Sequence, residues 1–182
     1  HPDPLQAVRQ SISLPVDNRP LTSYGKIRSG AIAVNDKTRP VPHEHLLPPL
    51  LEQLQAIGVP DDAVRILIAT GTHLPMPESE FPKILPREII ARYRIISHNC
   101  DDEENLIHLG ETKRGTPVLV NRQFMEADLR IVVGNIEPHH FAGFSGGVKT
   151  AAIGLTGRKT INHNHALLVE PGAKIAVYDQ NP

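Results

Sequence analysis

Three short runs of small and β-branched residues constrain the fold of this 182-residue chain more than any other feature. They are Ala31 to Val34, Val64 to Ala69 and Leu129 to Val133, and each runs into a polar loop. Between the first two runs, leucines recur at helical spacing over His45 to Ile57, and Gly58 follows where that helix would end. A strand, a helix and a second strand in this order predict a βαβ unit. The expected fold is therefore α/β: a Rossmann-like three-layer domain with a mostly parallel sheet and a site at the strand carboxyl ends.

The remaining elements have weaker signals. A short helix is predicted over Leu5 to Ile12, followed by an extended loop, and another over Arg122 to Ala127. Pro82 and Pro86 are expected to divide Glu78 to Arg94 into two short helices. Further strands are predicted over four ranges: Arg94 to Ser97, Leu106 to Leu109, Thr116 to Val120 and Lys174 to Tyr178. Residues 1–30 are expected to form an N-terminal extension of uncertain order, and residues 31–182 the folded domain.

Four acidic residues follow Cys100 in a row, from Asp101 to Glu104. They lack the spaced ligands and central glycine of a calcium loop, so a solvated turn is expected there. His98 and His108 flank this turn and are assigned to the same surface segment.

Composition excludes several classes of protein. The formal net charge is −1 and the sequence pI is near 6.9, which gives no reason to expect a nucleic-acid or membrane surface. Aromatic residues make up 4% of the chain, too few for a base-stacking single-strand binder. The single cysteine, Cys100, cannot form an internal disulfide, the opening residues show no basic segment followed by an apolar one, and no apolar run approaches about 20 residues. A small-molecule partner and a cytoplasmic location are expected.

The polar loops after the first two strands contain candidate functional residues. Asp36 and Arg39 follow the first strand and offer a carboxylate and a cation, although a solvated turn before two prolines is the alternative. His73 follows the second strand, two residues after Gly71. A histidine at this end of a buried strand occupies the place where α/β enzymes hold catalytic groups, but it could also be an ordinary hydrogen-bonded loop residue.

The stretch from Gly134 to His165 is the richest in chemistry. It contains adjacent histidines at 139 and 140, a glycine-rich turn, a lysine at 149 and an HxH pair formed by His163 and His165. The turn matches a phosphate loop at its first glycine, lysine and threonine, but Val148 replaces the glycine before the lysine. Backbone N–H groups in such a turn could still approach an anion. HxH on a strand or loop would point both rings the same way, towards a metal; capping of a helix after Ile161 is the alternative.

Four motifs occur together in this order: DxTRP (Asp36, Thr38, Arg39, Pro40), ATGTH (Ala69 to His73), GNIEPHHFAGFSGGVK (Gly134 to Lys149) and NH (Asn164, His165). In combination they resemble the lactate racemase family, whose members use a nickel-pincer nucleotide. The likeness runs from about Ala31 to the end of the chain. It implies that the chain is the N-terminal, cofactor-binding domain of such an enzyme, without the C-terminal domain that closes over the site in relatives.

The resemblance implies roles for individual residues. Lys149 would be joined to the cofactor through a thioamide, and His165 would complete the nickel coordination beside two sulfurs and one carbon of the pincer ring. His73 and His139 would be the acid/base groups. Arg39 would hold the substrate carboxylate. The remaining cofactor-lining residues are those of the first loop and the glycine turn: Asp36, Ser145, Gly146 and Gly147. No role is assigned to His140 or His163.

The implied reaction is racemisation or epimerisation of a 2-hydroxy acid. Hydride transfer from C2 to the pincer ring would leave a flat 2-keto acid, which turns and takes the hydride back on its other face, while a histidine on each side handles the hydroxyl proton. The implied partners are the hydroxy acid and the enzymes that make the cofactor.

Two other functions agree with the same residues. A zinc- or nickel-dependent hydrolase could use the histidines at 139, 140, 163 and 165, with Glu137 as the only nearby general base. A non-catalytic module could bind a nucleotide or phosphate through the turn from Ser145 to Lys149.

Overall fold

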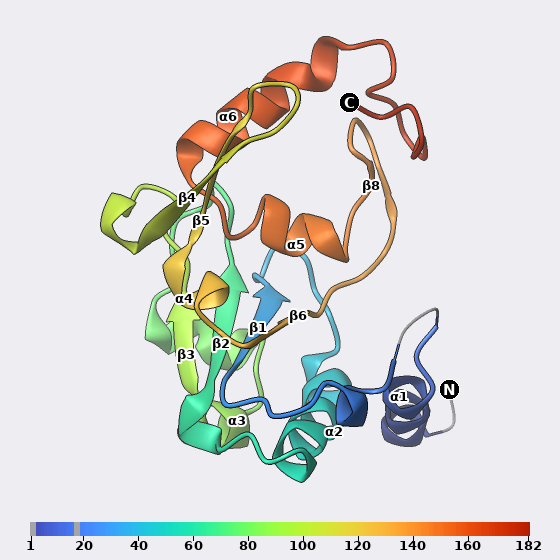
Figure 1. Ribbon diagram of the computed structural model, residues 1–182, viewed down its shortest axis with the longest axis vertical. Coiled ribbons are helices and arrows are strands. Elements are labelled where there is room, and N and C mark those ends of the chain that lie inside the picture. The colour runs from blue at the N-terminus through green and yellow to red at the C-terminus, as the bar shows by residue number, and fades with distance from the viewer. Residues whose placement is uncertain (1–2, 17–18) are drawn as a thin grey trace.

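The fold is built on a parallel four-stranded sheet with the strand order β3-β2-β1-β6 (Figure 1). The computed structural model describes residues 3–16 and 19–182. β1 (Gly30–Asn35) and β2 (Val64–Ala69) pair in parallel along their whole length and are connected by α2 (His43–Ala56). This arrangement is the predicted βαβ unit, so the α/β fold with a parallel sheet is confirmed. Gly58, with φ +90°, lies just beyond the end of α2, as predicted.

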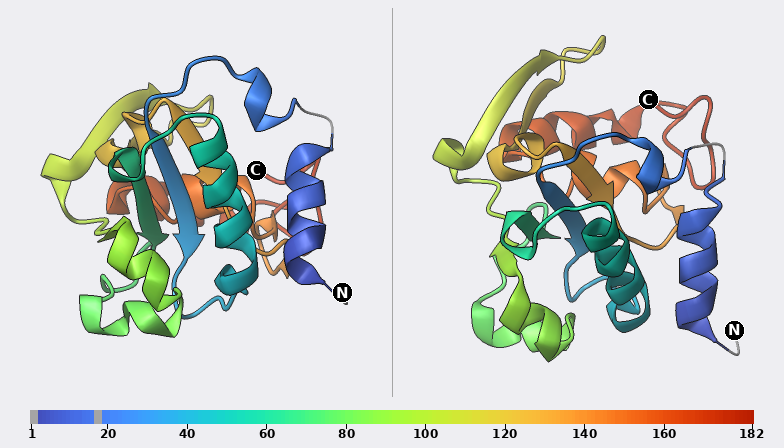
Figure 2. Two further views of the ribbon diagram at one scale, coloured as in Figure 1. Left: turned by 90° about the horizontal axis from the view of Figure 1, so that it is seen from below. Right: turned by 60° about the horizontal axis from the view of Figure 1, so that its bottom comes forward.

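Side chains that alternate along β1 divide the core into two layers. Ile32 and Val34 pack on one face against the buried leucines of α2. Ala31 and Ala33 belong to the opposite face, in a second cluster with Phe124. Small side chains on that second face allow the chain after β5 to pack close to the sheet. Helices and the β4–β5 hairpin therefore lie on the two sides of the sheet, which gives three layers (Figure 2).

The other strands and α-helices are short: α1 (Pro4–Ser13), α3 (Arg87–Arg92), β3 (Arg94–Ser97), β4 (Leu106–Glu111), β5 (Pro117–Asn121), α4 (Arg122–Met125), β6 (Leu129–Val132), β7 (Pro138–His139), β8 (Gly143–Phe144), α5 (Val148–Ala152) and α6 (Arg158–Ala166). The described residues also form 3₁₀ helices: η1 (Leu21–Ser23), η2 (Asp61–Ala63), η3 (Glu78–Lys83), η4 (Glu103–Asn105) and η5 (Leu167–Val169). β4 pairs antiparallel with β5, and β7 with β8, outside the main sheet.

The structure differs from the expected elements in three places. The continuous apolar run from Leu129 to Val133 predicts a buried strand; β6 is a strand, but it lies at an edge of the sheet and is only partly buried, because it pairs with β1 alone. Pro82 does not divide two helices: it lies inside the 3₁₀ helix η3, and the break falls at Pro86, the residue before α3. Lys174 to Tyr178 is not a strand, since it forms turns beside β8, where Ala176 N donates to Gly143 O.

His98 is not a surface residue: its side chain is 1% exposed. Its Nε2–H donates to Thr156 O at 3.0 Å, and its Nδ1 accepts from the Asn121 side-chain amide at 3.2 Å. The predicted surface position of His98 is wrong because the chain leaving β3 enters the core at this residue, between β2 and the turn before α6. His108, on β4, is exposed as expected.

The N-terminal helix α1 packs against α2 (Figure 1). Arg9 donates from Nε and Nη2 to the Glu52 carboxylate at 3.0 to 3.1 Å. The loop predicted after α1 includes Asp17 and Asn18, which lie outside the described residues, as do His1 and Pro2. Within residues 3–16 and 19–182, no helix combines the length and the apolar character needed to cross a membrane.

Candidate active site

The polar loops that follow β1, β2 and β6 meet at the carboxyl ends of these strands and enclose a cavity of about 220 Å³. Because parallel strands end at the same edge, residues far apart in the sequence line this cavity together. Eight of the nine residues predicted for catalysis or for binding cofactor, substrate or metal line it: Asp36, Arg39, His73, His139, Ser145, Gly146, Lys149 and His165. Gly147, the N-cap of α5, lies just outside the lining.

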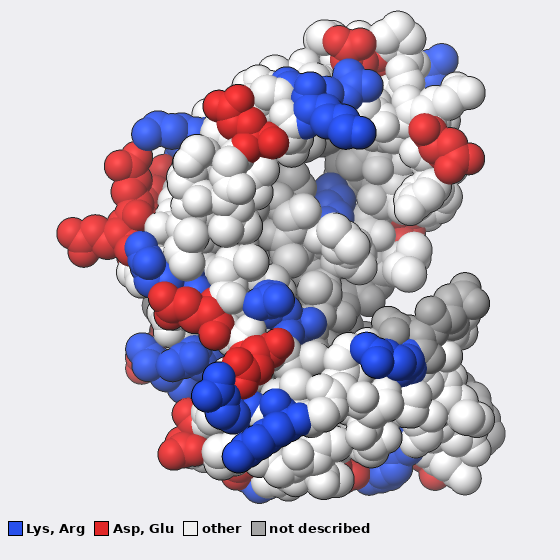
Figure 3. Space-filling model, in the orientation of Figure 1, with Lys and Arg blue, Asp and Glu red and all other residues white. Residues whose placement is uncertain are grey.

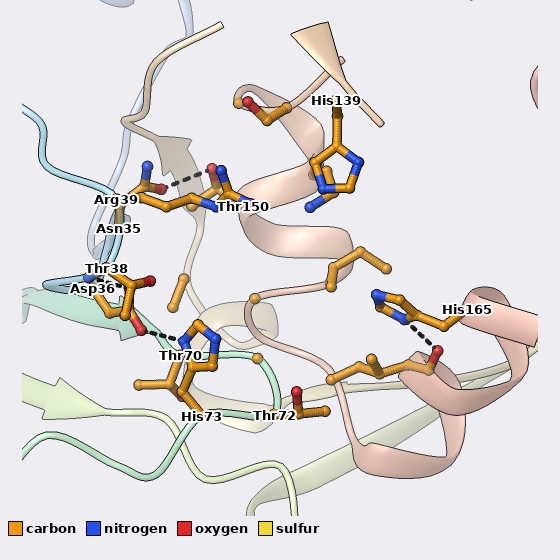
Figure 4. Close-up of a pocket in the computed structure, with 18 of the residues that line it drawn as sticks. Asn35, Asp36, Thr38, Arg39, Thr70, Thr72, His73, His139, Thr150 and His165 are labelled. Carbon is orange, nitrogen blue, oxygen red and sulfur yellow. Dashed lines mark hydrogen bonds and ion pairs between the residues drawn. The ribbon is translucent and has the colours of Figure 1, made fainter. Parts of the chain in front are cut away.

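His73 is held by a buried carboxylate. Its Nδ1–H donates to Asp36 Oδ2 at 2.7 Å, and Asp36 is 5% exposed (Figure 4). The other carboxylate oxygen, Oδ1, accepts from Thr38 N at 3.0 Å and from Thr38 Oγ1 at 2.6 Å. Both oxygens of Asp36 are thus engaged by the protein, which fixes the carboxylate and, through it, the orientation of the His73 ring.

His139 lies on the two-residue strand β7 and is 7% exposed. Its Nδ1 accepts hydrogen bonds from Ala142 N at 3.2 Å and, less closely, Phe141 N at 3.5 Å. The ring stacks on His140 and meets the edge of Phe141. Burial, followed by the charge of Lys149, lowers the pKa of His139 from 6.5 to about 4, so the ring is neutral at physiological pH.

The glycine turn brings Lys149 into the cavity. Gly146 has φ +78°, and a Cβ there would lie 2.0 Å from Asn135 O, so only glycine can bring the two loops this close. Gly147 then caps α5, which carries Lys149 in its first turn. Ser145 is buried, and its N–H donates to Glu137 O at 2.8 Å. Burial, and next the nearby Arg39 cation, lower the pKa of Lys149. Among the described residues its Nζ has no ion-pair or hydrogen-bond partner.

The two histidines of the HxH pair lie on α6, and not on a strand or loop. Residues i and i+2 of an α-helix lie about 200° apart around its axis, so the two rings diverge. His165 lines the cavity, with Nδ1–H donating to Ile161 O at 2.7 Å and Nε2 left with its lone pair (Figure 4). His163 instead contacts Thr116 Oγ1 on the hairpin side at 2.9 Å. The prediction that both rings point the same way is wrong, and so is helix capping after Ile161, which lies within α6.

Arg39 lines the cavity and forms an ion pair with Glu137. Its Nη1 donates to Glu137 Oε1 at 3.0 Å, and the two side chains are 42% and 44% exposed. Glu137 therefore neutralises a cation that faces the cavity, and the guanidinium keeps other N–H groups for an incoming anion.

The sequence did not reveal the groups that hold the loops together. Thr150 Oγ1 donates to Asn35 Oδ1 at 3.2 Å, and Asn35 Nδ2 donates to Asn135 Oδ1 at 3.2 Å. These two side-chain amides, of which Asn35 is buried, join β1, α5 and the loop after β6. The Phe141 ring makes edge-to-face contacts with the rings of both His139 and His165. The one indication in the sequence that Phe141 belongs to the site is its position directly after the two histidines.

The side chains alone do not form a metal centre. Within the described part of the chain, no three His, Cys, Asp or Glu side chains are arranged to hold a metal ion. The four-histidine site of the hydrolase alternative is not assembled, because His163 points away from the cavity.

The surface around the site has no single dominant charge. Figure 3 shows the molecule hollowed between the part that contains α6 and the part that contains α2, with basic and acidic residues interspersed over this face. This mixture agrees with the formal net charge of −1.

Comparison with known proteins identifies relatives over nearly the whole chain. The profile of the family described as "Lactate racemase N-terminal domain" matches residues 1–176. The lactate racemase of Lactiplantibacillus plantarum is 34% identical over 162 residues, which cover 88% of this chain and 38% of that protein. The lactate racemase of Thermoanaerobacterium thermosaccharolyticum is 30% identical over 178 residues, covering 96% of this chain and 42% of that protein.

Solved structures agree with this relationship. The lactate racemase apoprotein from T. thermosaccharolyticum superimposes with a TM-score of 0.91 at 31% identity, covering 99% of this chain and 44% of that one. A Thermotoga maritima protein shares the fold, with a TM-score of 0.76 at 24% identity over 98% of this chain and 46% of that one. This chain thus spans less than half the length of these relatives. Its sequence and its fold show that it belongs to the lactate racemase N-terminal domain family.

Proposed function

We propose that this chain is the cofactor-binding part of a racemase or epimerase that acts on a 2-hydroxy acid and uses a nickel-pincer nucleotide. The observation that carries the proposal is the convergence of His73, His139, Lys149 and His165 on one cavity beside Arg39. They come from four separate segments of the chain, and packing of the core alone gives no reason for such a set to meet.

Lys149 has the properties required of the attachment site. A lysine with a lowered pKa is more often a neutral amine, which is the form that can be acylated. An acidic neighbour would keep the amine charged, and none of the described residues forms an ion pair with Lys149. The positive-φ turn at Gly146 fixes the start of α5 and therefore the place of this amine.

His165 has the properties of a single protein ligand for nickel. Its Nδ1–H is bonded to the Ile161 carbonyl, which leaves the Nε2 lone pair directed at the cavity. A backbone partner on the second ring nitrogen is the usual support of a metal-bound histidine. The lack of a three-ligand site among the described side chains fits a metal whose other ligands come from an organic cofactor. When bound, this cofactor supplies a reversible acceptor for the hydride of C2.

The protein's own groups would bind the substrate and move its hydroxyl proton. Arg39 offers a guanidinium for the carboxylate. His73 and His139 line the same cavity and reach it from the ends of different elements, the loop after β2 and β7 (Figure 4). Both therefore can lie near the hydroxyl group, where an acid/base residue typically contributes about 10²–10⁴-fold to the rate.

Metal analysis combined with an assay tests this function against the alternatives. Protein produced together with the cofactor-synthesis enzymes should contain nickel and should convert either enantiomer of a 2-hydroxy acid into the racemate. Zinc with hydrolytic activity would favour the hydrolase. Protein that binds a nucleotide and holds neither metal nor racemase activity would favour the binding module, and either result would overturn the proposal.

A further inference from the structure

The segment from Gly172 to Asn181 packs against the β7–β8 hairpin, which carries His139 (Figure 1). Ala176 N donates to Gly143 O at 3.0 Å. The backbones approach so closely there that a Cβ on Gly143 would lie 2.0 Å from Val177 O. Ala176 has φ +57°, in the left-handed region that an L residue keeps only where its surroundings hold it. The segment is thus held firmly against the hairpin.

Asn181 connects this segment to a residue of the site. Its Nδ2 donates to Phe141 O at 2.8 Å and to Gly172 O at 3.3 Å. Both partners are carbonyl oxygens, which can only accept, so the amide nitrogen must face them. Because Phe141 lines the cavity, the Asn181 side chain joins the segment to the cavity wall.

One peptide group connects Asn181 with His139. The Phe141 carbonyl and the Ala142 N–H belong to the same planar unit and point in opposite directions. The N–H donates to His139 Nδ1 at 3.2 Å, while the carbonyl accepts from Asn181. A donor on the carbonyl fixes the plane of this peptide and polarises its N–H, which strengthens the bond to the ring. With Nδ1 engaged by the backbone, Nε2 is the ring nitrogen that remains for a ligand in the cavity.

The same contact restrains the Phe141 ring. The centroid of this ring lies 4.8 Å from that of His139, in an edge-to-face contact, and 5.1 Å from that of His165 on α6. By holding the backbone of Phe141, Asn181 limits how far this ring can move away from the two histidines.

Resting on the proposed function, we infer that Asn181 is a positioning residue: through the Phe141–Ala142 peptide it holds the His139 ring in the orientation that acid/base catalysis requires. Asn181 does not line the cavity, so it acts on the reaction through His139 and Phe141. Its loss should therefore lower kcat and change KM little, because substrate binding does not involve it.

NMR of the unloaded full chain tests the structural step without cofactor or substrate. Asn181→Asp keeps the shape of the side chain but removes both donors, and its carboxylate repels the Phe141 carbonyl. The Ala142 amide and the His139 ring nitrogens should change their chemical shifts. Asn181→Ala removes the donors without adding a charge and should move the same signals. Unchanged signals in both variants would overturn the inference.

Gln180→Glu is the matched control for this experiment. It makes the same change from amide to carboxylate at the neighbouring residue, which is exposed. The Ala142 and His139 signals should keep their wild-type positions. If Gln180→Glu moved them as far as Asn181→Asp does, added charge would be the cause, and the role of Asn181 would be overturned.

A double-mutant cycle with loaded protein tests the role in the reaction. Asn181→Asp should lower kcat by about 10–100-fold and leave KM within about twofold of wild type. If Asn181 acts through His139, adding Asn181→Asp to His139→Gln should cost at most about twofold in kcat beyond His139→Gln alone. Losses that multiply would show that Asn181 supports the site in general, and would overturn the inference. If loaded wild-type protein forms no racemate, the proposed function fails, whereas the NMR result still decides whether Asn181 orients His139.

Discussion

Arg39, which lines the cavity, forms an ion pair with Glu137 at 3.0 Å, and both side chains are about half exposed. An incoming carboxylate would have to share the Arg39 guanidinium with Glu137 or displace Glu137 from it. Because an exposed ion pair is worth about 0–1 kcal/mol, Glu137→Gln should tighten binding of a 2-hydroxy acid by about two- to fivefold, measured as the dissociation constant by calorimetry on loaded protein. Glu80→Gln, which removes the partner of Lys37, is the matched control and should change nothing. Weaker binding in Glu137→Gln would mean that Glu137 orients Arg39 and does not compete for it.

Two buried histidines make the stability of the fold depend on pH. Burial lowers the pKa of both His43 and His98 below the ordinary value of 6.5. The unfolded state therefore binds more protons below pH 6.5, so the stabilisation is complete above that pH and is lost as the pH falls through the lowered folded-state pKa values. Each histidine can add up to about 1.36 kcal/mol per pH unit to the slope.

Denaturant unfolding between pH 7.5 and 5 measures this slope. His98→Gln should make it shallower, even if the variant is less stable at every pH. Val59→Ala truncates a side chain that is 1% exposed and should lower the unfolding free energy equally at all pH values, with the wild-type slope. A wild-type slope in His98→Gln would show that burial of His98 does not cause the acid sensitivity.

At the scale of elements, the glycine turn before α5 is the most restrictive feature. Gly146 and Gly147 both have positive φ, +78° and +49°, but only at Gly146 would a Cβ meet a backbone atom, at 2.0 Å. Gly147→Ala should cost about 1–3 kcal/mol of unfolding free energy, because φ +49° with ψ −129° is a backbone conformation that L residues rarely adopt. Gly146→Ala should cost clearly more, because the loop after β6 must also move. Equal costs in denaturant unfolding would contradict this account of the turn.

Helix α6 separates the two histidines of the HxH pair. His165 faces the cavity, while His163 contacts Thr116 on the other side. In protein loaded with cofactor, His165→Ala should lower the nickel content measured by mass spectrometry, and His163→Ala should keep it near the wild-type value. Equal retention in both variants would remove His165 as the ligand.

Elements with a continuous pattern could be predicted from the sequence, and those decided by long-range packing could not. β1, β2 and α2 were predicted to within two residues, because an apolar run or a leucine stripe marks each of them. The HxH pattern by itself predicts a strand or loop, because the short segment after Ile161 has no helical pattern; the helix α6 forms where this segment packs beside β5. The sequence around His98 predicts a surface position, because its burial depends on partners that are distant in sequence, Thr156 and Asn121.

At the scale of the molecule, the parallel order of β1, β2 and β6 assembles the site. Asn35 and Ala69 are aligned at the ends of β1 and β2, so Asp36 and His73 follow at the same edge. That proximity follows from the predicted βαβ unit, but the hydrogen bond between the two side chains could not be foreseen from spacing. Gly71 N also donates to Gly154 O at 3.0 Å, which joins the loop of His73 to the turn between α5 and α6. The loops of three strands thus support one another around Lys149.

The central claim, that this cavity holds a cofactor covalently attached at Lys149, is tested most directly by the intact mass of protein produced together with the cofactor-synthesis enzymes. Wild-type protein should carry an added mass that maps to Lys149. The adduct should be absent from Lys149→Ala and from Lys149→Arg, which keeps the positive charge but cannot form the same bond. Fully active protein with an unmodified Lys149 would contradict the account.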